Sequence, residues 1–148
     1  MTAREYDCNN PTDQVTIAKK HKITEAVFNS GLSNFFGAGA TAVAPTVKTW
    51  QEMSDLMEGA DCTTMRLKLE MDENDTSNND IAISIEPFLE TTVNYSIALF
   101  KGVKANYDVA TFEFYKAKHN DSSFDIIFKG INAIGETVYC GDLSNLHP

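Results

Sequence analysis

The chain has 148 residues, of which 43% are hydrophobic, 10% aromatic and 22% charged, and this composition excludes an intrinsically disordered protein. Its length fits one globular domain with one core. The formal net charge of -9 disfavours direct binding to nucleic acid, and no apolar run approaches the roughly 20 residues of a membrane-spanning helix. We therefore expect a single domain over 1–148 that binds neither nucleic acid nor a membrane.

The first part of the chain is predicted to be mainly helical over 12–60, after a polar arm over 1–11. The pattern at the start of this region is ambiguous between strand and helix. Apolar side chains then recur at helical spacing, which predicts a helix from about Ile23 to Ser30. We expect Gly31 to end this helix, because glycine readily adopts the left-handed conformation that follows many helices.

A second helix is specified more strongly. Thr49 followed by Glu52 forms a capping-box pattern, and Gly59 marks a C-terminus. A connector of small residues over 37–45 precedes this helix. We expect the helix to place Trp50 on a sheet.

Apolar and polar residues alternate over several segments within 64–142, which is typical of strands half buried in an antiparallel sheet. In the first segment, Met65, Leu67 and Leu69 share one face. Six segments are predicted as strands: Thr64 to Met71, Ile81 to Ile85, Val93 to Phe100, Ala110 to Ala117, Phe124 to Ile131, and Thr137 to Cys140. We predict an α+β domain, with N-terminal helices packed on an antiparallel sheet of five or six strands and a polar tail over 143–148.

The order of these elements, helices followed by a meander of strands, resembles that of a cone-shaped, half-open barrel folded around its helices. Many small ligand-binding proteins and isomerases share this architecture, but the fold alone does not define a function.

Three cysteines, Cys8, Cys62 and Cys140, are too widely spaced for a zinc pattern and odd in number, so we predict reduced thiols that pack as small apolar groups. The first residues also lack the basic start and apolar segment of a secretory signal. We therefore expect the protein in the cytoplasm.

The negative charge is concentrated in one part of the chain. Between 51 and 90 there are 11 acidic residues against Arg66 and Lys68, which gives this segment a net charge of -9. The predicted binding residues are the acids of one loop: Asp72, Glu73, Asp75 and Asp80. The leading hypothesis is a non-enzymatic binding protein, of an inhibitor or immunity-like kind, that presents this acidic surface to a basic partner protein.

The same loop offers many oxygen atoms, which hard cations prefer, but it does not match a calcium-binding EF-hand. Ser77 stands where that motif requires glycine, and Ile83 stands where it requires glutamate. His119 and Cys140 form no recognisable catalytic pair, because the sequence around Cys140 shows no electropositive setting. We predict no metal and no cofactor, and these observations favour a protein that is not an enzyme.

Two alternative functions remain open. One is a small-molecule-binding protein or cofactor-free enzyme with a pocket between a helix and a curved sheet, lined by Trp50, Tyr95, Phe112 and Phe114. The other is a subunit of a homo-oligomeric assembly, which would be favoured if unpaired sheet edges joined between copies.

Overall fold

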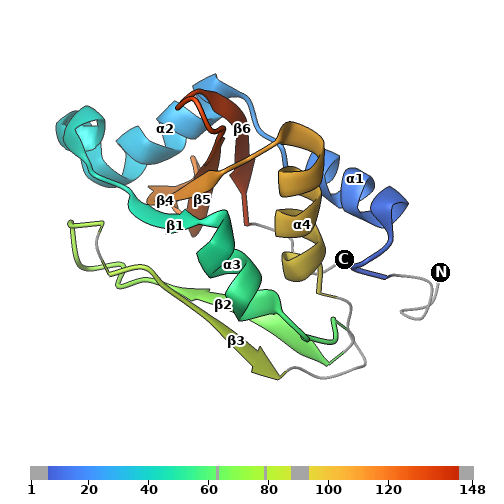
Figure 1. Ribbon diagram of the computed structural model, residues 1–148. Helices are drawn as coiled ribbons and strands as arrows, with labels where there is room; N and C mark the ends of the chain where they lie inside the picture. The colour runs from blue at the N-terminus through green and yellow to red at the C-terminus, as the bar shows by residue number, and fades with distance from the viewer. Residues whose placement is uncertain (1–6, 63, 79, 88–93, 144–148) are drawn as a thin grey trace.

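A computed structural model of the chain describes residues 7–62, 64–78, 80–87 and 94–143 (Figure 1). The helices are α1 (Pro11–Lys20), α2 (Glu25–Phe36), α3 (Trp50–Met57) and α4 (Ser96–Tyr107), with a 3-10 helix at Gly37–Ala42. The strands are β1 (Thr46–Thr49), β2 (Met65–Glu70), β3 (Ala82–Pro87), β4 (Thr111–Lys118), β5 (Phe124–Ile131) and β6 (Thr137–Asp142). The prediction of an α+β fold with antiparallel pairing is confirmed.

The strands form two sheets, so the prediction of one sheet with five or six strands was wrong. One sheet has four strands in the order β1-β4-β5-β6, and the other is a hairpin of β2 and β3. The four-stranded sheet is open, and it does not close into a barrel. Pro87 is the last residue of β3. Proline has no N–H to donate to a strand ladder, so it is expected at an edge or an end of a strand.

The segment predicted as a strand from Val93 to Phe100 is instead the start of α4, and Val93 itself lies outside the described residues. This helix is buried on most of its surface, including Ile97, Leu99 and Phe100. The first turn of α4, from Ile97 to Phe100, is apolar on every side, so it shows no clear helical periodicity and is equally compatible with a strand.

Local signals were more reliable elsewhere. Thr49 and Glu52 form the predicted capping box of α3, and β5 has the predicted bounds. The predicted helix near Ile23 is α2, which continues past Gly31 to Phe36. The ambiguous stretch before it is α1, capped by the side chain of Asn10.

The four-stranded sheet carries a core on each face (Figure 1). On one face, Phe112, Phe114 and Phe128 surround Phe100 of α4 with ring centroids 5.0 to 5.8 Å apart. The helices α1, α3 and α4 and the hairpin cover this face. The opposite face is covered by α2, and Phe28 of that helix packs there.

The outer edge of β6 is closed by the segment between α1 and α2. Ile23 donates its N–H to the carbonyl of Cys140 at 2.9 Å, and the carbonyl of His21 accepts the N–H of Asp142 at 3.1 Å. Lys22 forms a bridge with Gly141 between these two bonds. The second half of this edge, over 140–142, is therefore paired within the chain.

Candidate functional site

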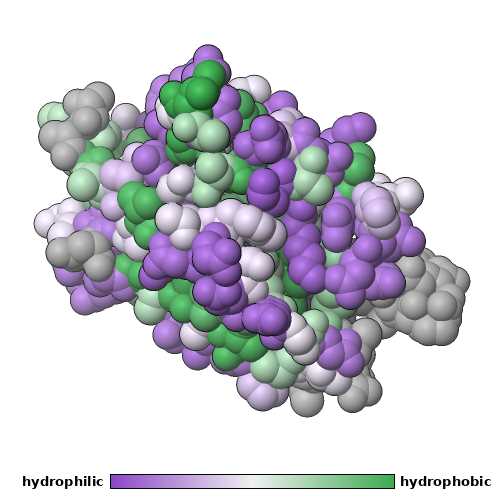
Figure 2. Space-filling view, viewed as in Figure 1, coloured by the Kyte–Doolittle hydropathy of each residue, from purple (hydrophilic) through white to green (hydrophobic). Residues whose placement is uncertain are grey.

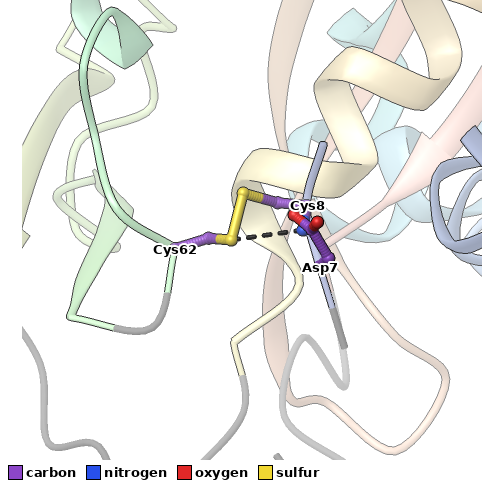
Figure 3. Close-up of side chains that lie close together, drawn as sticks. All are labelled: Asp7, Cys8 and Cys62. Carbon is purple, nitrogen blue, oxygen red and sulfur yellow. Dashed lines mark hydrogen bonds between the residues drawn. A yellow bond between two sulfur atoms is a disulfide. The ribbon is translucent and has the colours of Figure 1, made fainter. Parts of the chain in front are cut away.

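Cys8 and Cys62 form a disulfide, so the prediction of three reduced thiols was wrong for this pair (Figure 3). The bond joins the segment before α1 to the loop between α3 and β2, and both residues are buried. Figure 3 shows the N–H of Cys8 donating to the sulfur of Cys62, with Asp7 beside them. These three side chains do not form a metal-binding group, because the two sulfur atoms are bonded to each other.

Cys140 keeps its thiol and lies in the core beneath α2. Burial raises the pKa of this thiol, which opposes formation of the reactive thiolate. His119 contacts a different group: its Nε2 lies 2.9 Å from Oδ2 of the buried Asp125. Asp125 is not among the residues predicted from the sequence, and it lies opposite Ala117 in the β4–β5 hairpin.

The loop that carries Asp72, Glu73, Asp75 and Asp80, called the acidic loop below, contacts the four-stranded sheet through Lys116. The side chain of Lys116 is 0% exposed. The Lys116 ammonium lies 2.5 Å from a carboxylate oxygen of Asp80. It also donates to the backbone carbonyls of Asp72 at 2.9 Å and Asp75 at 3.0 Å. The oxygen atoms that suggested a cation site thus surround a positive charge that the protein itself supplies.

Asn78 provides a second attachment for this loop. Its side-chain oxygen accepts the N–H of Lys116 at 2.8 Å, and its side-chain nitrogen donates to the carbonyl of Phe114 at 2.8 Å. The hydroxyl of Thr46 donates to the carbonyl of Asn78 at 2.6 Å. The loop is therefore tied to both β1 and β4.

These contacts affect the charges of the loop. Burial alone would raise the pKa of Asp80, but hydrogen bonds from Lys116 and from the N–H of Asp72, together with the charge of Lys116, lower it below its ordinary value. The pKa of Asp75 is lowered mainly because its carboxylate accepts the N–H of Ser77. Both carboxylates are thus stabilised in the ionised form.

The predicted acidic site is only partly on the surface. Asp72 and Glu73 are exposed, whereas Asp75 and Asp80 are half-buried and hold the loop in place. Other exposed acids of the segment are Glu52 and Asp55 on α3, Glu58 and Asp61 after it, and Glu70 at the end of β2. Figure 2 shows hydrophilic residues over α3 and hydrophobic ones beside them over the hairpin. The exposed acids of the segment are therefore distributed over several elements, with one group on and after α3.

The structure places the four residues of the predicted aromatic pocket, Trp50, Tyr95, Phe112 and Phe114, in different settings. Phe112 and Phe114 are fully buried against each other and the surrounding rings. Trp50 is half-buried, with its ring 6.3 Å from that of Phe112, so its predicted position on the sheet is confirmed. Tyr95 lies just before α4, with the ammonium of Lys20 5.1 Å from its ring. Neither of the two cavities described next is lined by these four residues.

The larger cavity is a groove of about 750 Å³ between β2 and the start of β5. One wall is formed by the six consecutive residues from Arg66 to Met71, and the other by the three from Phe124 to Ile126. Glu73, Asn94 and Leu143 complete the lining among the described residues. A smaller cavity of about 200 Å³ lies between α2 and the end of β4.

The wall formed by β2 is a strand edge. Alternate side chains of a strand point to opposite faces, so six consecutive residues can line one cavity only along the edge. The opposite edge of β2 pairs with β3. The N–H of Leu67 points away from β3, and it donates to the hydroxyl of Ser96 at 2.9 Å.

The charged side chains on this wall are paired with one another or with Glu86 of β3. Arg66 lies 2.6 Å from Glu86, and Lys68 lies 3.1 Å from Glu70 and 3.4 Å from Glu86. The hydrogen bond from Arg66 lowers the pKa of Glu86. The wall therefore combines balanced charges on one face of β2 with apolar side chains on the other.

No known protein family matches the sequence, and neither the curated proteins nor the solved structures contain a match. None of the helices in the described parts of the chain has the length and apolar character needed to span a bilayer.

Proposed function

We propose that this is a non-enzymatic interaction protein that binds a strand of another polypeptide in the groove beside β2. The observation that supports this proposal most directly is the strand edge between Arg66 and Met71, which lines a groove of about 750 Å³. Exposed sheet edges are templates for strand addition, in which backbone hydrogen bonds give affinity and side-chain pockets give specificity. The apolar residues on both walls provide area that a bound strand would bury.

The test is a matched pair of substitutions. Phe124 lines the groove and is 40% exposed, whereas Ile134 lies outside both cavities and is 80% exposed. Phe124→Lys should abolish retention of the bound polypeptide from the native host, and Ile134→Lys should leave it unchanged. Equal retention by both variants would show that the groove is not the binding site.

We also propose that the exposed acids on α3 and directly after it (Glu52, Asp55 and Glu58) attract a basic partner protein. Within the described residues, Glu52 has one distant cationic neighbour, Lys48 at 4.0 Å. Asp55 accepts a hydrogen bond from the neutral side chain of Gln51. Unbalanced surface charge of this kind quickens association with an oppositely charged protein and is screened by salt.

This second function predicts a salt-dependent rate of association. The charge reversals Asp55→Lys and Glu58→Lys should slow binding of a basic partner, whereas Glu136→Lys, at the turn between β5 and β6, should not. Surface plasmon resonance at several salt concentrations measures this rate. A rate that is insensitive to salt would leave the acids with a solubilising role alone.

The volume of the groove also falls within the range of small-molecule pockets, roughly 300 to 1,000 Å³, which keeps a ligand carrier as a further candidate. A small apolar ligand that raises the melting temperature of the native protein, but not that of Phe124→Lys, would favour the carrier over strand binding.

We propose further that the protein works in an oxidising compartment, in place of the cytoplasm that the sequence led us to expect. Disulfides persist in such compartments and are rare in the cytosol. Thiol labelling of the denatured protein from its native host should modify Cys140 alone, and three thiols only after reduction. Labelling of all three without reduction would restore the cytoplasmic expectation.

A further inference from the structure

Three asparagines of the chain stand in the triplet Asn-X-Ser/Thr, which is the acceptor motif for N-linked glycosylation. The triplets begin at Asn74, Asn94 and Asn120, and all of their residues lie within the described parts of the chain. Asn10 is also followed by threonine two residues later, but the proline between them excludes it from the motif. Secreted proteins, in which disulfides also persist, are the class in which such triplets are modified.

The first triplet lies on the acidic loop. Asn74 and Thr76 are exposed, whereas Asp75 between them is half-buried. The carbonyl of Asp75 accepts a hydrogen bond from the Lys116 ammonium at 3.0 Å, and its carboxylate accepts the N–H of Ser77 at 2.8 Å. The middle residue of the triplet therefore holds the loop on the protein, while the amide and the hydroxyl that the motif requires are on the outside.

The third triplet forms the tip of the β4–β5 hairpin. The N–H of His119 donates to the carbonyl of Ser123 at 2.8 Å, and the three residues between them, which are the triplet, are all exposed. The side-chain oxygen of Asn120 accepts the side-chain N–H of Asn34 at 3.1 Å. The oxygen and the nitrogen lie on different arms of the planar amide. This contact therefore leaves the nitrogen, which is the atom that glycosylation modifies, on the exposed surface.

The second triplet is buried and contributes to the fold. Asn94 is 3% exposed and Ser96 is 0% exposed. The side-chain oxygen of Asn94 accepts the N–H of Ser96 at 2.9 Å, and the hydroxyl of Ser96 accepts the N–H of Leu67 at 2.9 Å. A glycan is bulky and polar and has to lie at the surface, so the folded protein has no room for one on Asn94.

We propose that Asn74 and Asn120 are N-glycosylation sites and that Asn94 stays unmodified. In this reaction the amide nitrogen attacks C1 of the first sugar of a lipid-linked oligosaccharide. The N–C1 bond forms, the C1–O bond to the lipid pyrophosphate breaks, and the nitrogen loses one of its two protons. Both glycans would stand on loops that connect paired strands, where they displace no packed side chain. These sites rest on the proposed oxidising compartment and not on the groove.

Deglycosylation in heavy-oxygen water tests the three triplets in one sample. Peptide-N-glycosidase converts each glycosylated asparagine to aspartate and inserts one oxygen atom from the water, which mass spectrometry locates. Protein isolated from its native host should carry heavy oxygen at positions 74 and 120. Position 94 and the exposed Asn10, whose triplet contains proline, should carry none. Heavy oxygen at position 94 would overturn the inference, and its absence from 74 or from 120 would overturn the assignment of that site.

Substitution of the hydroxyl separates modification from a structural effect. Thr76→Ala removes the hydroxyl that the motif requires and leaves Asn74 in place, whereas Thr76→Ser keeps a hydroxyl. Produced in the native host, Thr76→Ala should lose one glycan and migrate faster in electrophoresis, as should Asn120→Gln, and Thr76→Ser should migrate like the wild type. Asn29→Gln, on the exposed surface of α2 and outside every triplet, is the control and should change nothing. Wild-type migration of Thr76→Ala would show that Asn74 carries no glycan.

The state of the cysteines separates these sites from the compartment on which they rest. We expect protein from the native host to have one free thiol and two glycans. A protein with the Cys8–Cys62 disulfide and no glycan would leave the compartment standing and overturn the glycosylation sites. A protein with three free thiols and no glycan would overturn both.

Discussion

The four-stranded sheet and the β2–β3 hairpin are stabilised in different ways. The sheet has an apolar core on each face, whereas the hairpin packs on one face and is attached at each end by a specific contact. Cys62 is bonded to Cys8 just before β2, and Lys116 holds the loop between β2 and β3. A two-stranded unit is marginal by itself, so these contacts compensate for the small area it buries. The groove edge lies between the two attachments.

Reduction of the disulfide should have the largest effect and should weaken the hairpin more than the sheet. The bond closes a separation of 54 residues, for which loss of the cross-link costs about 4 kcal/mol of unfolding free energy. Urea unfolding with and without reductant measures the loss. The double variant Cys8→Ser with Cys62→Ser should unfold alike in both conditions; a further loss on reduction would point to a different pairing of the cysteines.

Trp50→Ala tests how much the packing of α3 on the four-stranded sheet stabilises the protein. The indole packs between α3 and Phe112 and is half-buried, so its removal should cost about 3 kcal/mol through lost contacts and a cavity. Trp50→Phe, which keeps an aromatic ring there, should cost less. Urea stability close to that of the wild type for Trp50→Ala would mean that the indole belongs to a binding surface.

Lys116→Met removes the charge that holds the loop. Asp80 and two backbone carbonyls would then lose their hydrogen-bond donor, and the free energy of unfolding should fall by about 2 kcal/mol. The loss is smaller than for a fully buried ion pair, because the Asp80 carboxylate is partly exposed to solvent. Adding Asp80→Asn should recover part of this loss. A double-mutant cycle in urea gives the coupling, and strictly additive effects would show that the two groups do not interact.

Acid should release the loop before it affects the sheet. The pKa of Asp80 is lowered from 3.8, so this carboxylate contributes stability above its unfolded pKa, and the contribution is lost as pH falls below 3.8 through the folded value. Unfolding free energies between pH 7 and pH 3 should therefore fall less steeply in Asp80→Asn than in the wild type. If the unfolding free energies of the two proteins fell equally with pH, the Asp80 carboxylate would not be stabilised by Lys116.

The smallest effect concerns metal ions. Because the ammonium of Lys116 occupies the centre of the acidic loop, a chelator or added calcium should leave the melting temperature unchanged. A shift of more than about 4 °C, roughly 1 kcal/mol for a domain approaching this size, would mean that a cation contributes to the hairpin.

Short-range patterns predicted the elements whose signals are local. The capping box at Thr49 and the strand from Phe124 are examples. The disulfide and the split into two sheets depend on contacts between distant segments, which no local pattern records. Lys116 is an intermediate case: it shares the two-residue period of Phe112 and Phe114, so alternation places a cation on the core face near many acids. That signal was present and would have identified the anchor of the loop.

The two attachments of the hairpin also affect how the molecule opens. With both ends held, β2 and β3 cannot separate from the sheet without breaking a covalent bond or displacing a buried ammonium. The amide hydrogens that pair β2 with β3 should then exchange with solvent only through global unfolding, at rates like those of β4 and β5. After reduction one end is released, and the hairpin should become a separate cooperative unit that exchanges faster than the sheet.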